Sequence, residues 1–251
     1  MKLIFLMLFP IIAFAKVKTE KVIYESNGVK LEGVLAYNDS VKKPVPGILV
    51  FHEWMGNGPY TLMRAKELAQ LGYVAFAADV YGQGVYAKDM KEASELAGKY
   101  KGDRKLMRQR AQAALMALLS SKKVNKNKIA AIGYCFGGTV ALELARDGAP
   151  LSSVVSFHGG LSTPLKAETM TPKILILHGA DDPYVPGTEV AEFQEEMRKA
   201  KADWQFISYG NTVHSFTNPE AGSDNSKGAA YNKISAERAW DQMKAFFKTT
   251  L

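Results

Sequence analysis

The sequence predicts an α/β protein, with a mostly parallel sheet covered by helices on both faces. Short apolar runs alternate with longer stretches in which apolar residues recur every three or four positions. Residues 45–52 are almost entirely apolar, which is typical of a strand buried on both faces. An antiparallel hairpin precedes this alternation, because Asn27-Gly28 suits a type I′ turn between two strand-like segments. With 251 residues, 47% of them apolar, the chain can bury one large core.

The first half of the chain supplies the hairpin and the first strands of the sheet. The hairpin strands are predicted at residues 17–26 and 29–38, and the first buried strand at 45–52. A helix follows, with its apolar side formed by Leu62, Ala65, Leu68 and Leu71. Then come a strand at 73–78, a polar loop at 81–84, helices at 88–100 and 103–120, and a strand at 128–132.

The second half repeats the alternation of strand and helix. A helix is predicted at 139–146, strands at 152–157, 173–177 and 204–208, and helices at 188–200 and 232–248. The last helix is expected to turn Ile234, Ala239, Met243 and Phe246 towards the core. Only the connection at 159–171 lacks a helical pattern.

The amino end has the features of a cleavable signal peptide at residues 1–15. Lys2 supplies the positive charge, residues 3–14 the apolar stretch, and Ala13-Phe14-Ala15 the cleavage signal. The apolar stretch is shorter than the ~20 residues of a membrane-spanning helix. We therefore expect an exported protein, periplasmic or secreted, whose mature part is a single domain at residues 16–251. Its one cysteine excludes an internal disulfide framework.

The formal net charge of +7 does not by itself indicate a nucleic-acid partner. The densest basic segments are residues 99–110 and 122–128, and neither carries interleaved aromatic residues or a nucleic-acid-binding motif. They are better explained as solvated helix faces. We expect a monomer that binds no nucleic acid and has no stable membrane insertion once the signal is cleaved.

The most informative stretch is Gly133-Tyr134-Cys135-Phe136-Gly137-Gly138, between a strand-like and a helix-like segment. Strand, Gly-x-nucleophile-x-Gly and helix form the pattern of a nucleophile elbow, in which a strained turn exposes the central side chain. The helix N-terminus beneath Cys135 would favour a thiolate. A glycine-rich turn whose small cysteine fills the core is the alternative.

Polar residues recur where the predicted strands end, which is where parallel sheets carry their functional groups. They are His52-Glu53, Asp79, Cys135, His158, His178 with Asp181-Asp182, and His214. A nucleophile needs a base, and the base needs a group that holds its tautomer. Cys135, Asp182 and His214 follow the chain order nucleophile, acid, histidine, which is that of α/β-hydrolases.

Four segments together resemble the dienelactone hydrolase family of α/β-hydrolases. They are His52-Glu53-Trp54-Met55-Gly56, the Cys135 elbow, His178 to Pro186, and Tyr209 to Phe216. The resemblance implies a catalytic triad of Cys135, Asp182 and His214 on an α/β-hydrolase fold, with Asp181 only a neighbour. It also implies that Glu53 contacts the resting thiol and helps to generate the thiolate.

The mechanism that follows is hydrolysis of a carboxylic ester or lactone through a thioacyl-enzyme. The oxyanion is expected to be held by the backbone N–H groups of Phe136 and Trp54. No metal or organic cofactor is required. A zinc site built from the strand-end histidines is disfavoured, because no second histidine completes an H-E-x-x-H pattern.

The substrate is left open by the sequence. Tyr81, Gln83, Ser215 and Phe216 are candidates for the substrate pocket, by their place in the resembling segments. The family holds its substrate's carboxylate with two arginines, but Gln83 and Asn218 stand at the corresponding positions. Two alternatives remain: an exported thiol sensor, and a ligand-binding protein without catalysis on the same fold.

Overall fold

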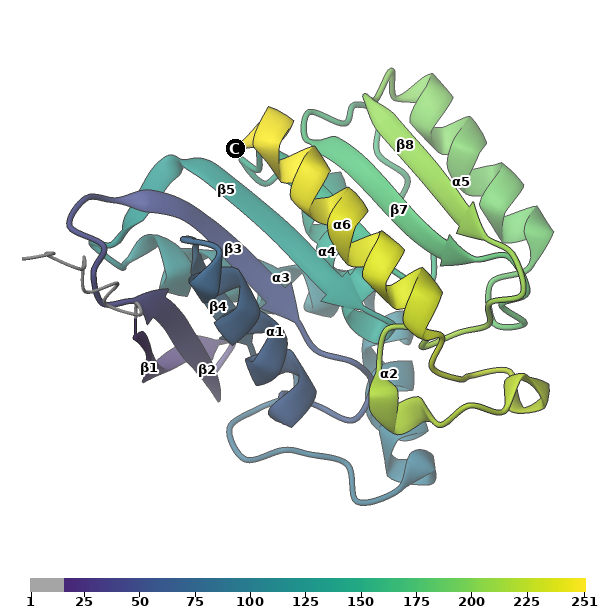
Figure 1. Cartoon of the computed structure of the whole chain (residues 1–251), viewed down its shortest axis with the longest axis horizontal. Helices are drawn as coiled ribbons and strands as arrows, with labels where there is room; N and C mark the ends of the chain where they lie inside the picture. Colours follow the sequence, from purple (N-terminus) through teal and green to yellow (C-terminus); the bar gives the residue numbers. More distant parts are fainter. Residues whose placement is uncertain (1–15) are drawn as a thin grey trace, which may run out of the picture.

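The computed structural model describes residues 16–251, so the predicted signal peptide at residues 1–15 lies outside the described residues. Eight strands form one sheet (Figure 1): β1 (Val17–Ser26), β2 (Val29–Asn38), β3 (Val45–Phe51), β4 (Val74–Ala78), β5 (Val124–Tyr134), β6 (Ser153–Phe157), β7 (Lys173–Gly179) and β8 (Trp204–Tyr209). Six α-helices accompany them: α1 (Pro59–Gln70), α2 (Met90–Gly102), α3 (Arg104–Leu119), α4 (Phe136–Arg146), α5 (Gly187–Lys199) and α6 (Lys233–Thr250).

The sheet is mostly parallel, as the alternation of strands and helices predicts. Its order is β1-β2-β4-β3-β5-β6-β7-β8. The hairpin β1–β2 is antiparallel, and β2 pairs antiparallel with β4, whereas every pair from β4 to β8 is parallel. Asn27 and Gly28 both have positive φ, 50° and 73°, as a type I′ turn requires. The carboxyl ends of the parallel strands therefore share one edge of the sheet.

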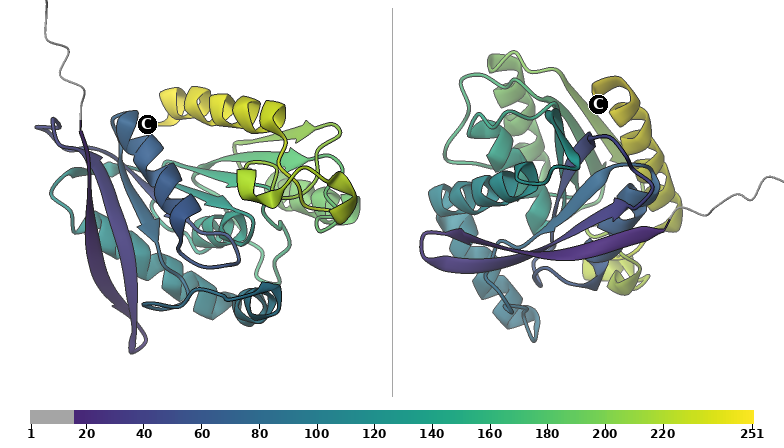
Figure 2. Two further views of the ribbon diagram at one scale, coloured as in Figure 1. Left: turned by 60° about the horizontal axis from the view of Figure 1, so that its bottom comes forward. Right: turned by 90° about the vertical axis from the view of Figure 1, so that its left-hand side faces the viewer.

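Helices cover both faces of the sheet (Figure 2). On one face lie α1 and α6, which bury side chains such as Leu68 and Met243 against apolar residues of the strands. On the other lie α2, α3, α4 and α5, with Leu115 of α3 and Met197 of α5 in the core. The doubly covered sheet and the preceding hairpin are both confirmed.

The sequence predicts the elements better than it predicts which side chains are buried. Ile234 is wrong as a core residue of α6, since it is 60% exposed, whereas Ala239, Met243 and Phe246 are buried as predicted. At about 100° per residue, Ile234 lies ~140° around the helix axis from Ala239, on the solvent side. Leu71 is also wrong as part of the α1 face, because it caps the helix end and is exposed.

Two further differences from the prediction are an earlier start of one strand and two short helices. β5 begins at Val124, before the predicted start at residue 128, and its pairing with β3 shifts register between Pro46 and Gly47. The segment after β8 contains two 3₁₀ helices, Pro219–Ala221 and Asn225–Lys227, which no apolar periodicity indicates because they are too short.

The connection at residues 159–171, which has no helix, is instead held by arginine side chains, of which Arg146 is buried and Arg108 half-buried. Arg146 donates to Leu161 O at 2.7 Å, and Arg108 donates to Leu165 O at 2.7 Å. Arg146 also forms an ion pair with Glu196 of α5, N···O 2.7 Å, with both side chains buried. The arginines satisfy backbone carbonyls that an irregular segment leaves without partners.

No helix within residues 16–251 combines the length and apolar character needed to cross a bilayer.

Candidate active site

The elbow around Cys135 has the close packing that its glycines predict. Cys135 joins β5 to α4 with φ 53° and ψ −118°, a conformation that residues other than glycine rarely adopt. A Cβ on Gly133 would lie 1.9 Å from Gly137 O, and one on Gly137 would lie 2.2 Å from Phe51 O. Strand and helix can approach this closely only because both positions lack a side chain. The half-buried Cys135 thus sits at the carboxyl end of the sheet, at the N-terminus of α4.

His214 and Asp182 form a buried pair beside the elbow. The imidazole Nδ1 lies 2.7 Å from Asp182 Oδ2, and the other carboxylate oxygen accepts the backbone N–H of Tyr184 at 2.9 Å. Asp181 is exposed, and its backbone N–H donates to Thr212 O. Of the two adjacent aspartates, therefore, only Asp182 reaches the imidazole.

The electrostatics of His214 favour its charged form. Burial acts to lower the pKa of the imidazole, but the negative charge of a Cys135 thiolate and the hydrogen bond to Asp182 outweigh burial. The resulting pKa is raised from 6.5 to about 10. The surroundings of His214 therefore favour a proton on the imidazole, next to the Cys135 sulfur.

Glu53, near the start of the loop that follows β3, faces Asn218. Its Oε2 accepts from Asn218 Nδ2 at 2.5 Å, and among the hydrogen bonds of residues 16–251 none joins Glu53 to Cys135. Burial raises the pKa of the Glu53 carboxyl to about 7, although the Asn218 amide and the positive charge of His214 act to lower it. Glu53 thus titrates near neutral pH, within the charge environment of the Cys135–His214 pair.

The two backbone groups expected to hold an oxyanion belong to Phe136 and Trp54. Phe136 is the first residue of α4, where N–H groups have no partner within the helix. The Trp54 carbonyl accepts the hydroxyl of Tyr81 at 2.9 Å, which fixes the loop that carries the Trp54 N–H. Tyr81 is close enough to Cys135 that, after burial, the negative charge of Cys135 is the next cause of its raised pKa.

The other candidates for the substrate pocket differ in exposure. Gln83 is exposed and donates from Nε2 to Glu32 at 3.1 Å. Ser215 is half-buried, next to His214, with φ 54°. Phe216 is fully buried and packs against His158 with 5.2 Å between ring centroids, so it contributes to packing under the site.

Three residues at the site have contacts that the sequence does not reveal. His158 accepts the backbone N–H of Cys135 at Nδ1, 3.0 Å, and its Nε2 lies 2.7 Å from Thr217 Oγ1. Tyr184 places its ring edge-on to His214, with centroids 5.3 Å apart. The only sequence signals are the place of His158 at a strand end and that of Tyr184 just after Asp182.

The strand-end histidine His52 is packed and hydrogen-bonded. Its Nδ1 donates to Glu53 O at 2.6 Å, and its Nε2 accepts the Val80 N–H at 3.2 Å. His178 packs against Phe206, with 5.3 Å between centroids. Within residues 16–251, no group of three or more His, Cys, Asp or Glu side chains has an arrangement that could hold a metal ion.

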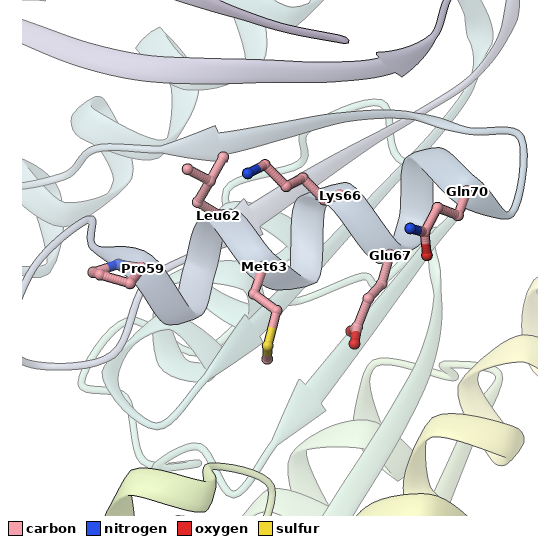
Figure 3. Close-up of a pocket in the computed structure, with 6 residues that line it drawn as sticks. All are labelled: Pro59, Leu62, Met63, Lys66, Glu67 and Gln70. Carbon is pink, nitrogen blue, oxygen red and sulfur yellow. The ribbon is translucent and has the colours of Figure 1, made fainter. Parts of the chain in front are cut away.

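A separate hollow of about 480 Å³ runs along the exposed side of α1 (Figure 3). Its walls are Pro59, Leu62, Met63, Lys66, Glu67 and Gln70. All six belong to one helix, and the hollow is open to solvent. None of the candidate site residues lines it, so it adds nothing to the site around Cys135.

Comparisons with known proteins show which family the chain resembles over most of its length. The model of the "Dienelactone hydrolase family" matches residues 31–251, which confirms the resemblance seen in the four sequence segments. A solved structure described as a dienelactone hydrolase-like promiscuous phosphotriesterase, P91, from metagenomic libraries is 40% identical, with a TM-score of 0.89 over 93% of this chain and 98% of that chain.

Two curated relatives cover nearly the whole chain. A protein of Aquifex aeolicus, provisionally named carboxymethylenebutenolidase, is 29% identical over 91% of this chain and 97% of its own length. A Bradyrhizobium protein, provisionally named 2-oxo-3-(5-oxofuran-2-ylidene)propanoate lactonase, is 27% identical over 88% of this chain and 91% of its own length.

Proposed function

The chain belongs to the dienelactone hydrolase family and is an ester-hydrolysing enzyme with an α/β-hydrolase fold, and from this premise we propose that Cys135 is its nucleophile. The reaction is hydrolysis of a carboxylic ester or lactone through a thioacyl-enzyme. His214 is the acid–base group, and Asp182 orients it.

One observation carries the proposal most strongly. Cys135 occupies the strained position of a strand–turn–helix elbow, beside the imidazole that Asp182 holds. Strained backbone at a non-glycine residue persists only where the surrounding structure imposes it, and it is concentrated at functional sites. A cysteine that merely filled the core would need neither the strain nor the charged imidazole.

The proposed reaction begins with the proton on His214. The Cys135 thiolate attacks the carbonyl carbon, and the tetrahedral oxyanion is held by the N–H groups of Phe136 and Trp54. As the carbon–oxygen bond breaks, His214 gives its proton to the leaving alkoxide, which departs as the alcohol. The neutral imidazole then takes a proton from water, the hydroxide attacks the thioester, and the thiolate leaves. Product acid is released, and the proton taken from water stays on His214, which restores the starting thiolate and imidazolium.

Intact-mass spectrometry during turnover of activated esters and lactones tests this proposal. The expected result is a mass increase equal to the acyl group, located on Cys135 by peptide mapping. Cys135→Ala should show neither the adduct nor turnover. Turnover by Cys135→Ala, or an acyl group carried by another residue, would contradict the proposal.

A second candidate reaction is the hydrolysis of neutral phosphotriesters. It is favoured by the 40% identity to the structure described as a promiscuous phosphotriesterase and by the absence of an arginine at residues 83 and 218. The thiolate would attack phosphorus and expel the alcohol, and water would then cleave the phosphorus–sulfur bond. A diethyl aryl phosphate added to the same mass assay should give a phosphoryl adduct on Cys135.

We also propose that the enzyme acts outside the cytoplasm as a monomer beginning at Lys16. The support is the charged and apolar amino end with Ala13-Phe14-Ala15 before the expected cleavage point. Amino-terminal sequencing of protein recovered outside the cytoplasm should read from Lys16, and sedimentation should give a mass near that of one chain. An intact Met1 chain retained in the cytoplasm would contradict export.

A further inference from the structure

His158 connects the nucleophile to the loop that carries the base. It follows β6, directly beside the elbow that ends β5, and its Nδ1 lies 3.0 Å from the backbone nitrogen of Cys135. Its Nε2 lies 2.7 Å from Oγ1 of Thr217, three residues beyond His214. One fully buried imidazole thus bridges the backbone of Cys135 and the His214 loop.

The hydrogen bonds fix which tautomer bridges them. A backbone N–H can only donate, so Nδ1 of His158 must present its lone pair to Cys135. The ring proton is then on Nε2, which donates to Thr217 Oγ1. A protonated ring would direct a second N–H at the Cys135 N–H, so this geometry requires the neutral imidazole. Burial and the positive charge of His214 lower the pKa of His158 well below its usual range, in agreement with the geometry.

Backbone strain occurs at the elbow of Cys135, at His158 and in the loop that carries His214. In residues 16–251, six residues other than glycine have positive φ, and three of them are Cys135, His158 and Ser215. These are the nucleophile, the bridging residue and the neighbour of His214. Each such conformation costs about 1–3 kcal/mol and persists only where its contacts hold it. The N–H of Cys135 is shared between Phe157 O, at 3.0 Å, and His158 Nδ1.

The far end of the bridge is anchored to α1. Tyr60 donates its hydroxyl to Thr217 Oγ1 at 2.8 Å, and Arg64 donates from Nη2 to Thr217 O at 3.0 Å. Arg64 also donates from Nε to the Tyr60 hydroxyl at 3.2 Å. Residues of α1 therefore hold both the hydroxyl and the carbonyl of Thr217, so that its hydroxyl is a fixed acceptor for His158.

We propose that His158 is a positioning residue that sets the distance and orientation of Cys135 relative to His214, by tying the backbone of one to the loop of the other through Thr217. The inference rests on the proposed role of Cys135 as the nucleophile. The hydrogen bonds of the His158 ring go to the Cys135 backbone and to Thr217, not to the sulfur or to the His214 nitrogens, and its ring packs edge-on against His214 with 5.2 Å between centroids. His158 acts on kcat, because attack and proton transfer require both groups in place together, whereas substrate binding does not require the bridge.

Two substitutions break the bridge from opposite ends. Thr217→Val keeps the shape of the side chain but removes the acceptor for Nε2. His158→Asn keeps an acceptor for the Cys135 N–H, because the asparagine Oδ1 takes the place of Nδ1, but cannot reach Thr217. Asparagine also tolerates positive φ better than most residues, so this variant should fold. Thr250→Val is the matched control, since Thr250 bonds Ser153 Oγ at 3.0 Å at the opposite end of β6.

The expected result for Thr217→Val and His158→Asn is a fall in kcat of about tenfold or more, with KM changed by less than about twofold. Iodoacetamide should alkylate Cys135 more slowly in the same proportion. Because both changes remove one link, the double variant should lose about as much as either single variant. Thr250→Val should keep the wild-type kcat, and circular dichroism melting should place all assays below the unfolding transition.

Three results would overturn the inference: a wild-type kcat in Thr217→Val, losses that multiply in the double variant, or a loss confined to KM. If Thr217→Val does not fold, His158→Asn alone decides between the same outcomes. Cys135→Ala separates this inference from the proposed function. If that variant is inactive while Thr217→Val is unaffected, the role of Cys135 as nucleophile is supported and the positioning role of His158 is rejected. If Cys135→Ala is active, the proposed function itself falls.

Discussion

The amide of Asn218 and the carboxylate of Glu53, 165 residues apart in the sequence, meet in a hydrogen bond of 2.5 Å. The bond joins the loop after β3 to the loop after β8. Asn218 is an amide where the family carries an arginine, so Glu53 has a neutral partner. Desolvation outweighs the Asn218 amide and the positive charges of His214 and Arg64 and favours the protonated form of Glu53, and this leads to a measurable dependence of stability on pH.

The wild-type protein should lose stability as the pH rises and Glu53 becomes charged, and Glu53→Gln, which cannot ionise, should not show this part of the loss. The folded-state pKa of Glu53, about 7, exceeds its ordinary value of 4.5, because burial disfavours the charge. The folded protein therefore binds this proton more tightly, and the stabilisation is fully present below about pH 4.5 and lost as the pH rises to about 7. Urea unfolding at several pH values in this window should show a smaller decline for Glu53→Gln than for the wild type.

Glu32→Gln is the control for that measurement. Glu32 is half-buried, and hydrogen bonds from Lys21 and Gln83 lower the pKa of its carboxyl, so its stabilisation is lost in the opposite direction, as the pH falls. An equal decline in the wild type and Glu53→Gln between about pH 5 and about pH 7 would show that Glu53 does not titrate there.

The triad should lose activity as a unit. Cys135→Ala and His214→Ala should each lower kcat by about as much as the double change, because neither residue acts without the other. Cys135→Ser should also lose most activity, since a hydroxyl is a far weaker nucleophile than a thiolate. Steady-state kinetics on one activated ester, with circular dichroism as a check on folding, measures all four variants. More than about a tenth of the wild-type kcat in Cys135→Ala would refute the mechanism.

The adjacent aspartates provide a matched comparison of position. Asp182→Asn should lower kcat by about 10³-fold or more, because the amide cannot hold the imidazole in the same tautomer. Asp181→Asn should change kcat by less than about threefold, since the exposed Asp181 makes only a backbone bond to Thr212. The same kinetic assay applies, and equal effects of the two variants would contradict the assignment of Asp182.

A carboxylate on the substrate should give little advantage. Gln83 and Asn218 donate their amide groups to Glu32 and Glu53, so neither of these two positions offers a cation to an anionic group. We expect kcat/KM for matched neutral and carboxylated esters to agree within about tenfold at low salt. A preference of about 100-fold or more for the acid, roughly 2.7 kcal/mol, would reveal an anion site elsewhere.

Glu196→Ala should destabilise the fold without touching the site. It would leave Arg146 with one fewer partner in the interior, and breaking a buried pair in this way typically costs about 3–5 kcal/mol. Glu195→Ala, one residue earlier on α5, is the control, because Glu195 is exposed and its pairing with Arg198 and Lys199 should contribute less than about 1 kcal/mol. Urea unfolding of both variants measures the difference, and comparable losses would show that the buried pair is not the cause.

The sequence predicts most of the local structure, because local rules govern it. Both hairpin strands begin and end at the predicted residues, since Asn27-Gly28 sets the turn and hence the register. The order of the parallel strands is not predicted, because the side-chain pattern of a strand buried on both faces does not identify its neighbours.

In the candidate site, too, the sequence predicts the residues that belong to local patterns but not the contacts that depend on strand order. The spacing of the glycines predicts Cys135, the order along the chain predicts an acid followed by His214, and the resemblance to the family selects Asp182 over Asp181. The hydrogen bond between His214 and Asp182 supports that choice. The bond from Cys135 N to His158 could not be predicted. It requires β6 to lie beside β5, and that neighbour relationship arises only when the whole sheet is assembled.

The contact between Gly133 and Gly137 also determines where this enzyme can be re-engineered. Even a single methyl group at either position would overlap backbone atoms, so a mutagenesis library gains nothing from varying them. Gln83 and Asn218 lie on loops beyond β4 and β8, where new side chains need not enter the space between strand and helix. Selection for new substrates can therefore search those loops while the elbow stays unchanged, so that specificity and catalytic machinery vary independently.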